Sequence, residues 1–329
     1  MIKIVINKIF SCYLNAIASS IGFISCLMCF IVFSNSQFKL NFYKYFKMEL
    51  IFIGFDLILS ALATIVDCND SLVKDHYLSR AYQLIFIVYF KSVLEFCANY
   101  FCIFGTIDFY LTISQSKFNI FSKLSYKIIC LILFLIGCIM FSFRIFERSI
   151  ADSIDISNNK TVYYLAKTKF SETTILKTIN IISFFIRDFI YIFILIILNY
   201  FIFRKVRDSI NKKIYILQNS GGESSVADNK IKNTKNSLKL MILVGNLNNI
   251  FGRLTILINL TLEVSIENYT LDNYGIIFLN ISIFAVYTSY LIKFMLYYLT
   301  NNTFRDIFKN YYSNLLVYLK LSKKLSNQV

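Results

Sequence analysis

The chain contains no proline and no tryptophan, and His76 is the only histidine among its 329 residues. Because imidazole is the commonest metal ligand in proteins, a histidine-based metal centre is not expected. The eight cysteines lie almost entirely inside or beside apolar runs, without histidine partners at zinc spacing. The chain also has no GxSxG, HExxH or P-loop motif. We therefore expect no enzyme activity and no bound cofactor.

Acidic residues are scarce, since 19 Asp and Glu stand against 34 Lys and Arg and leave a formal net charge of +15. In a soluble protein such an excess would suggest nucleic-acid binding. Here the basic residues lie in short loops between apolar runs. Nucleic acid is therefore not an expected partner.

Apolar residues dominate what is present, at 57% of the chain with a mean hydropathy of +0.60. Runs of about 20 apolar residues recur, and each can cross about 30 Å of hydrocarbon as a helix. We predict an all-α membrane protein, a single seven-transmembrane helix bundle over residues 1–329 in contact with a lipid bilayer. The expected spans are 14–33, 48–66, 84–113, 128–143, 179–203, 238–264 and 274–299. The fourth is short, and the third and sixth carry charges, so a count of six stays open.

Basic residues alternate between loops, which indicates an orientation because cytoplasmic loops hold an excess of Lys and Arg. The basic loops are 39–47, 117–127, 204–239 and 305–324. We predict a plasma-membrane protein with an extracellular N-terminus and a cytoplasmic C-terminus. Lys3, Lys8 and the fairly basic loop 144–177 argue mildly for the opposite orientation.

A short amphipathic helix is expected after the last span, over residues 302–319. Its large apolar residues recur at helical spacing, at Phe304, Ile307, Phe308, Tyr311 and Leu315. Such a helix is typical of one that lies on the membrane surface.

Several charged residues fall inside the apolar runs, where each costs about 2.5 kcal/mol or more and usually faces the bundle interior. Lys91 and Glu95 are one helical turn apart, at the spacing of a same-helix ion pair. We predict that they line an outer cavity that binds ligand. The further candidates for this cavity are Asn99, Arg187, Asn249 and Arg253.

Three points about these charges stay open. Lys91 and Glu95 could equally form a self-neutralised pair that only packs the bundle. Adjacent helical residues point apart, so only one of Arg187 and Asp188 needs to face inward. Asp56, midway along the second span, is either an interior cation or water site or a carboxyl bonded to polar neighbours.

Three motifs occur in order along the seven expected spans: Asp56 within Phe52–Leu57, the triplet Asp108-Phe109-Tyr110, and Tyr297 followed by Asn301 and Phe304-Arg305. This pattern resembles the rhodopsin-like (class A) G-protein-coupled receptors, of the divergent, lineage-expanded invertebrate type, between residues 14 and 311. The last spacing is the most specific element of the resemblance.

The resemblance implies a receptor for an extracellular small molecule or short peptide that signals to a heterotrimeric G protein. It gives Asp56 the role of a sodium site in the switch core. It gives Asp108, Tyr110, Lys293 and Tyr297 roles in switching and transmission, and suggests Asp56 as the partner of Lys293. The inner ends of the third, fifth and sixth spans would contact the G protein.

The chain also departs from the family pattern. Phe109 replaces the arginine of the triplet, and Lys293-Phe294 stands where Asn-Pro is expected. The absence of proline means that helix kinks must arise elsewhere, for example at glycines. The second outer loop has no cysteine, which leaves Cys68 without an obvious disulfide partner.

Three alternative functions remain. A membrane transporter should show internal repeats or broken half-helices near the midplane, and no convincing repeat is present. A seven-helix ligand-gated channel of inverted topology would place the N-terminus inside, against the charge pattern. A receptor-derived protein that no longer signals would fit the loss of the triplet arginine at Phe109.

Overall fold

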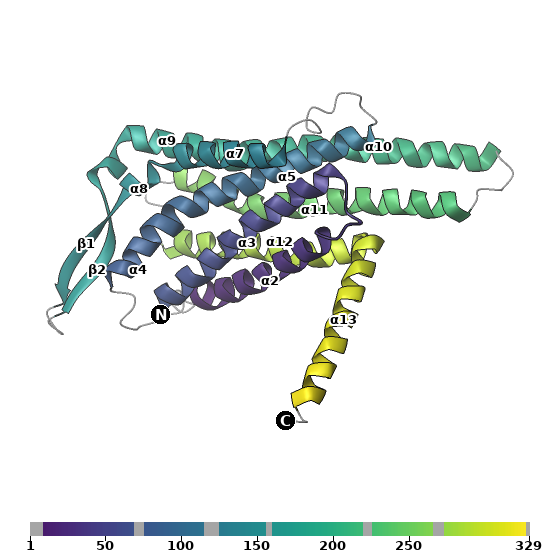
Figure 1. Ribbon diagram of the computed structural model, residues 1–329. Coiled ribbons are helices and arrows are strands. Elements are labelled where there is room, and N and C mark those ends of the chain that lie inside the picture. The colour runs from purple at the N-terminus through teal and green to yellow at the C-terminus, as the bar shows by residue number, and fades with distance from the viewer. Residues whose placement is uncertain are drawn as a thin grey trace.

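The computed structural model describes residues 9–68, 76–114, 125–155, 160–219, 226–265 and 273–326. Nearly all of this part of the chain is helical (Figure 1). The main helices are α2 (Asn15–Phe33), α3 (Asn41–Cys68), α4 (Tyr77–Tyr82), α5 (Lys91–Ile113), α7 (Tyr126–Phe141), α8 (Arg144–Glu147), α9 (Thr174–Phe184), α10 (Ile190–Asn219), α11 (Val226–Ser265), α12 (Asn273–Thr300) and α13 (Asn302–Ser326). Short π or 3-10 segments adjoin them: η1 (Ile9–Leu14), η2 (Gln83–Phe90), η3 (Lys169–Glu172) and η4 (Phe185–Phe189).

All seven predicted segments lie in helices, so the all-α membrane class is confirmed. In the described residues, six helical stretches are long and apolar enough to cross a membrane: Ile9–Phe33, Tyr77–Ile113, Tyr126–Glu147, Thr174–Asp208, Ser237–Asn259 and Gly275–Thr300. The protein is therefore a multi-pass membrane protein. The second predicted span falls in α3, which packs between α2 and α5.

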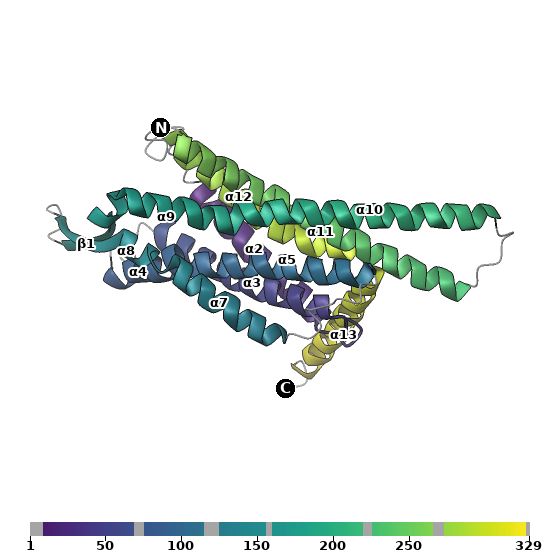
Figure 2. The ribbon, with the colours of Figure 1, turned by 90° about the horizontal axis from the view of Figure 1, so that it is seen from above.

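The helices form a closed ring in which α2, α3, α5, α10, α11 and α12 each contact the next, and α12 returns to α2. Figures 1 and 2 show their long axes running roughly along one direction, with the connections gathered at two ends. The start of η1, the hairpin β1–β2 and the start of α9 lie at one end, called here the N-terminal end. The far ends of α5 and α10, with α13, lie at the opposite end.

Helix α7 packs on the outside of this ring, against α5. Its buried residues recur every four positions, at Ile129, Leu133, Gly137 and Phe141, so they form one narrow stripe. A Cβ at Gly137 would lie only 3.1 Å from Val93 Cγ1, so glycine permits the two helices to approach closely. The other faces of α7 expose Leu131, Ile132, Leu135, Ile136 and Ile139, which suits contact with lipid.

A β-hairpin departs from the purely helical prediction. Strands β1 (Arg148–Asp155) and β2 (Lys160–Lys167) pair antiparallel, with Arg148 opposite Lys167 and Asp155 opposite Lys160. From the sequence, only a basic loop is expected over this segment. Each strand has eight residues, but a single two-stranded hairpin offers little periodicity for a sequence pattern to reveal.

The predicted surface helix is present as α13 and begins at Asn302, as expected, but continues to Ser326. Figure 1 shows it turning steeply away from the direction of the bundle. Phe304 and Ile307 are buried against the bundle, whereas Tyr311, Tyr312 and Leu315 are exposed. The first turns of α13 are therefore anchored to the bundle, and its later apolar residues are exposed.

Candidate functional site

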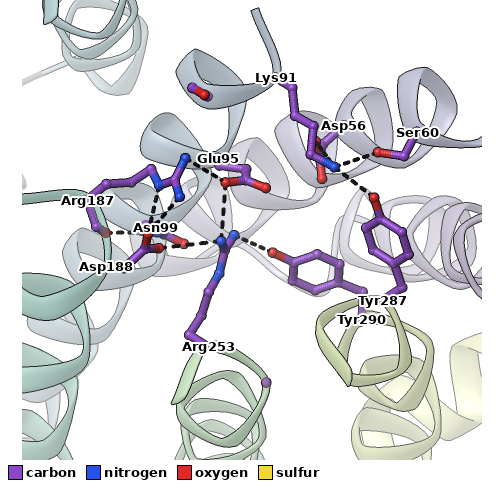
Figure 3. A network of polar contacts seen from close by, with 12 residues as sticks. Asp56, Ser60, Lys91, Glu95, Asn99, Arg187, Asp188, Arg253, Tyr287 and Tyr290 are labelled. Atoms are coloured by element: carbon purple, nitrogen blue, oxygen red, sulfur yellow. Dashed lines mark hydrogen bonds and ion pairs between the residues drawn. The ribbon is translucent and has the colours of Figure 1, made fainter. Parts of the chain in front are cut away.

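The ionisable residues predicted inside the spans meet one another in the bundle core (Figure 3). Lys91, the first residue of α5, extends toward α3, where its Nζ lies 3.6 Å from Asp56 Oδ1. The same ammonium donates hydrogen bonds of 2.7 Å to Ser60 Oγ and to the hydroxyl of Tyr287 on α12. Lys91 therefore supplies the positive charge beside Asp56 at the position where a sodium ion was considered.

Glu95 follows one turn later on α5, but its ion-pair partners come from other helices. Its Oε2 lies 3.0 Å from Arg187 Nη1 and 3.3 Å from Arg253 Nη1. The carboxylate thus joins α5 to η4 and α11. The same-helix pair with Lys91, which the sequence left open as an alternative, is therefore not the arrangement found, since the ion-pair partners of Glu95 are Arg187 and Arg253.

Arg187 and Asp188 both face the interior, which corrects the expectation that only one of them needs to. Their side chains are 6% and 0% exposed, and Arg187 Nη2 and Nε lie 2.7 and 2.9 Å from Asp188 Oδ2. Both residues lie in the π-helical stretch η4. A π-turn contains more residues than an α-turn, so consecutive side chains are rotated less and can share a face.

Arg253 of α11 completes this group of charges. Its Nη1 lies 3.5 Å from Asp188 Oδ1, and its Nη2 donates a 2.6 Å hydrogen bond to the hydroxyl of Tyr290 on α12. Glu95 and Asp188 are therefore each shared between two arginines, Arg187 and Arg253. Two acids and two bases form a cluster in which partners can be exchanged without leaving a charge alone.

Lys293 pairs with Glu49, not with Asp56 as the resemblance suggested. Lys293 Nζ lies 2.5 Å from Glu49 Oε1, and the two side chains are 1% and 3% exposed. Asp56 is already bound by Lys91, so Lys293 on α12 reaches an acid nearer the opposite end of α3. Asn249 donates to the same Glu49 Oε1 at 3.5 Å and to Cys102 Sγ at 3.3 Å.

Sequence reasoning missed three partners in this region. Glu49 stands seven residues before Asp56 on α3, which is two helical turns and the same face. Tyr290 precedes Lys293 by three residues on α12, again on one face. Helical spacing from the recognised charges could therefore have identified Glu49 and Tyr290, whereas Tyr287 bonds to Lys91 on another helix and gave no such signal.

Eight buried or nearly buried ionisable residues are joined by these pairs, and they are called here the ion network. It contains four acids and four bases, so its formal charge is zero in a chain of net charge +15. Its members are Glu49, Asp56, Glu95, Asp188, Lys91, Arg187, Arg253 and Lys293. Pairing offsets the large desolvation cost of each charge, and removing one partner exposes that cost again.

Asn99, the last of the predicted ligand residues, supports the network from α5. Its Nδ2 donates a 3.0 Å hydrogen bond to the backbone oxygen of Arg187 within η4. Closer to the opposite end, Asn246 of α11 donates to Asn199 Oδ1 at 3.0 Å and to Thr106 Oγ1 at 3.2 Å. These amides connect α11, α10 and α5 below the ion network, and the sequence analysis did not single them out.

The predicted transmission residues lie toward the α13 end, among aromatic rings. Phe33 contacts Tyr297 and Phe304 with centroid distances of 5.3 Å each, and Phe42 contacts Phe109 at 5.3 Å. We call the following set the aromatic cluster: Phe33, Phe38, Phe42, Tyr43, Phe109, Phe294, Tyr297, Phe304 and Phe308. It joins α2, α3, α5, α12 and α13.

Asp108 and Tyr110 flank Phe109 and have different surroundings. Asp108 is 1% exposed, and Tyr110 is half-buried with its ring 5.9 Å from that of Phe201 on α10. Phe109 itself is 1% exposed, so it belongs to the core of the aromatic cluster. The triplet thus lies near the α13 end of α5, with Asp108 and Phe109 buried and Tyr110 half-buried.

An open cavity of about 390 Å³ lies between the hairpin and the helical segments α4 and η2. Its lining residues are Arg80, Gln83, Ile87, Val88, Arg148, Tyr164 and Leu165. None of the predicted ligand residues lines it, because those side chains are engaged with one another in the core. Lys91 follows Ile87 by one helical turn and, at 19% side-chain exposure, is the most exposed member of the ion network.

The chain matches no protein-family model, and no curated protein matches it significantly.

Proposed function

We propose that this protein is a ligand-operated, seven-helix membrane receptor of the G-protein-coupled type. The observation that carries the proposal is the ion network, in which two acids each contact two arginines from different helices. Partner exchange within such a cluster moves helices against one another while keeping every buried charge compensated. A receptor needs a bistable helix packing of this kind.

The proposed topology has seven spans, with α3 as the second. The 28 residues of α3 can extend about 42 Å, which exceeds the thickness of a hydrocarbon core. The N-terminus lies outside and the basic ends of α5, α10 and α11 lie inside, at the plasma membrane. Cys12 is disulfide-bonded, which supports an oxidising compartment on the N-terminal side.

The ligand, a small molecule or short peptide, acts from the N-terminal end. Lys91 is the network residue that it reaches first, and Glu95, Asn99, Arg187, Asn249 and Arg253 respond below it. A ligand shifts the equilibrium only by binding one packing more tightly than the other. If Lys91 moved away from Asp56, another positive charge would have to compensate the Asp56 carboxylate.

Transmission runs from the ion network through Lys293 and Asn246 to the aromatic cluster. Tyr297 and Phe109 belong to this cluster, and Asp108 and Tyr110 flank Phe109, so a shift of α12 alters the packing around all of them. The inner ends of α5, α10 and α11 then separate to admit a heterotrimeric G protein. Lys91 takes the place of the sodium ion beside Asp56 in this proposal.

A cell assay tests the proposal. The full chain, carrying an outer N-terminal tag and an inner luminescent donor, is expressed with acceptor-labelled Gα subunits of each class. Arg253→Gln breaks the partner-exchange cluster, and we expect at least a severalfold rise in ligand-free recruitment over wild type at equal surface staining. The control variant Lys177→Gln removes an exposed positive charge outside the network.

Two results would overturn the proposal. One is an N-terminal tag that stains only in permeabilised cells. The other is the absence of recruitment of any Gα class by wild type, Arg253→Gln and the charge-retaining Arg253→Lys. The transporter alternative is disfavoured because the described spanning helices run through the core without broken half-helices.

A further inference from the structure

Arg144, the first residue of α8, is a half-buried base beside the ion network. Its Nε is fully buried and has no hydrogen-bond partner. The ion pairs of the described residues join Glu49, Asp56, Glu95 and Asp188 to other bases, and none of these pairs includes Arg144. The guanidinium therefore keeps at least one donor unused at a place where burial makes an unused donor costly.

Two phenylalanine rings hold this guanidinium beside that of Arg187. The Arg144 Cζ lies 5.0 Å from the ring centroid of Phe184 and 5.9 Å from that of Phe141. The Arg187 Cζ lies 4.7 Å from the centroid of Phe184 and 6.0 Å from that of Phe141. An aromatic ring attracts a cation but supplies no oxygen for its N–H groups. Arg144 is therefore held in place by stacking while its charge stays without a counter-ion.

The charges around these rings do not balance. All three side-chain nitrogens of Arg187 are engaged with Glu95 and Asp188. Arg253 shares the same two acids. With Arg144 added, this group of described residues holds three bases and two acids. A further negative charge at Arg144 would restore neutrality and offset the repulsion between Arg144 and Arg187.

Glu147 is the acid that could supply this charge from within the chain. It follows Arg144 by three residues on α8, a spacing that permits a same-helix ion pair. No such pair is formed in the described part of the chain. The backbone oxygen of Glu147 accepts hydrogen bonds from the amide and the hydroxyl of Thr168, at 3.2 and 3.3 Å, where α8 ends and β1 begins. The counter-ion of Arg144 is therefore left to come from outside the chain.

We propose that Arg144 anchors a site for an oxyanion, a carboxylate or a phosphate group, between α8 and the junction of α9 with η4. This inference rests on the proposed receptor function and gives its ligand a negative charge. Figure 1 shows α8 near the N-terminal end, which is the end where the ligand acts in that proposal. Arginine suits the task because its planar guanidinium matches carboxylate and phosphate oxygens in geometry.

An occupant of this site acts on the ion network through Phe184. Phe184 is the last residue of α9 and directly precedes η4, which carries Arg187 and Asp188. An oxyanion that binds Arg144 lowers the positive field on Arg187 and changes the packing of the ring that both cations share. The oxyanion thereby favours one arrangement of the cluster without contacting its acids.

The test measures the melting temperature of the purified full chain in lipid nanodiscs. Benzoate and phenylphosphate are the soluble oxyanions, and benzamide is the neutral match for benzoate. In nanodiscs of phosphatidylcholine alone, we expect at least one oxyanion to raise the melting temperature and benzamide to raise it much less. Nanodiscs of equal parts phosphatidylcholine and phosphatidylglycerol test the lipid source. If the headgroup occupies the site, they raise the melting temperature of the wild type, but not of Arg144→Gln, without any added ligand.

Variants of neighbouring residues assign the effect. Arg144→Gln should weaken the apparent affinity for the oxyanion about tenfold or more, as expected for the loss of a charged hydrogen bond. Arg144→Lys keeps the charge without the planar fork and should retain part of the affinity. Arg148→Gln removes an exposed arginine at the start of β1 and should leave binding unchanged. Glu147→Gln removes the acid that competes for Arg144 and should not weaken binding.

Four results would overturn the proposal. They are the absence of protection by any oxyanion, soluble or lipid, equal protection by benzamide, equal behaviour of Arg144→Gln and Arg148→Gln, and a loss of stability in Glu147→Gln as large as in Arg144→Gln. The last would show that Glu147 is the partner of Arg144. Oxyanion binding that depends on Arg144, without recruitment of any Gα class, would instead sustain the site and overturn the receptor function.

Discussion

The two halves of the bundle are held together by different kinds of contact. Toward the N-terminal end and the middle, the ion network joins five helical segments through paired charges. Toward the α13 end, the aromatic cluster joins α2, α3, α5, α12 and α13 through ring contacts. Charged contacts are directional and specific to a partner, whereas aromatic packing depends mainly on buried area and shape. In the proposed receptor, the first region would exchange partners and the second would transmit movement by repacking.

The largest expected loss of stability comes from removing one charge of a fully buried ion pair. Lys293→Met leaves Glu49 unpaired in the core, and we expect a loss of about 3–5 kcal/mol of stability. The double variant Glu49→Gln with Lys293→Met should recover most of that loss, because no lone charge remains. Thermal unfolding in nanodiscs measures both, with Lys309→Met as the exposed control. A double variant as unstable as the single one would show that packing, not charge, holds this site.

A substitution of similar severity in the aromatic cluster should depend on buried volume rather than on charge. Phe33→Ala leaves a cavity among Phe38, Tyr43, Tyr297 and Phe304, and should cost about 3–5 kcal/mol. Phe33→Leu keeps most of the volume and should cost less than about 1.5 kcal/mol. The melting temperatures of the two variants give the difference. Equal losses would mean that ring geometry rather than buried volume stabilises the cluster.

A smaller change tests the hydroxyl that anchors Arg253. Tyr290→Phe removes the acceptor of its 2.6 Å hydrogen bond and should cost about 1.5–3 kcal/mol, the usual range for a bond to a charged group. We expect ligand-free Gα recruitment to rise as well, because Arg253 is freed to exchange partners. Tyr200→Phe, at a 60% exposed position, is the matched control for both measurements. If neither the stability nor the recruitment changes, the Tyr290 hydroxyl does not anchor Arg253.

The smallest effect is expected for a charge at the aromatic end. Lys44 lies over the ring of Tyr126 with its Nζ 5.9 Å from the centroid, in a half-buried position. Lys44→Met should lower stability by only about 0.5–1 kcal/mol, since a cation–π contact that is not fully desolvated is weak. Unfolding of Lys44→Met beside Lys293→Met compares the same substitution in the two regions. A loss as large as that of Lys293→Met would contradict the contrast between them.

Much of the architecture could be predicted because membrane-spanning helices require long runs of apolar residues. Long apolar runs give the helices, and the amphipathic spacing after residue 300 gives the start of α13. Interior charges are also visible in sequence, since their cost in hydrocarbon makes each one conspicuous. The residues Asp56, Lys91, Glu95, Arg187, Arg253 and Lys293 were all recognised in this way, and all lie in the core.

The pairing among these charges could not be predicted, because it depends on how helices are rotated and how far each extends along its neighbours. The resemblance suggested Asp56 for Lys293, but the packing of α3 against α5 gives Asp56 to Lys91 and leaves Glu49 for Lys293. Local backbone changes had a similar effect at η4, where a π-turn brings Arg187 and Asp188 onto one face.

The sequence by itself determined that this protein is a helical membrane protein with charges that must be buried together, because hydrophobicity and desolvation act on each residue regardless of its neighbours. Only the tertiary structure decided which acid compensates which base, where the cavity opens and how the hairpin lies beside it. These depend on contacts between segments far apart in the chain, and such contacts follow from the packing of whole helices.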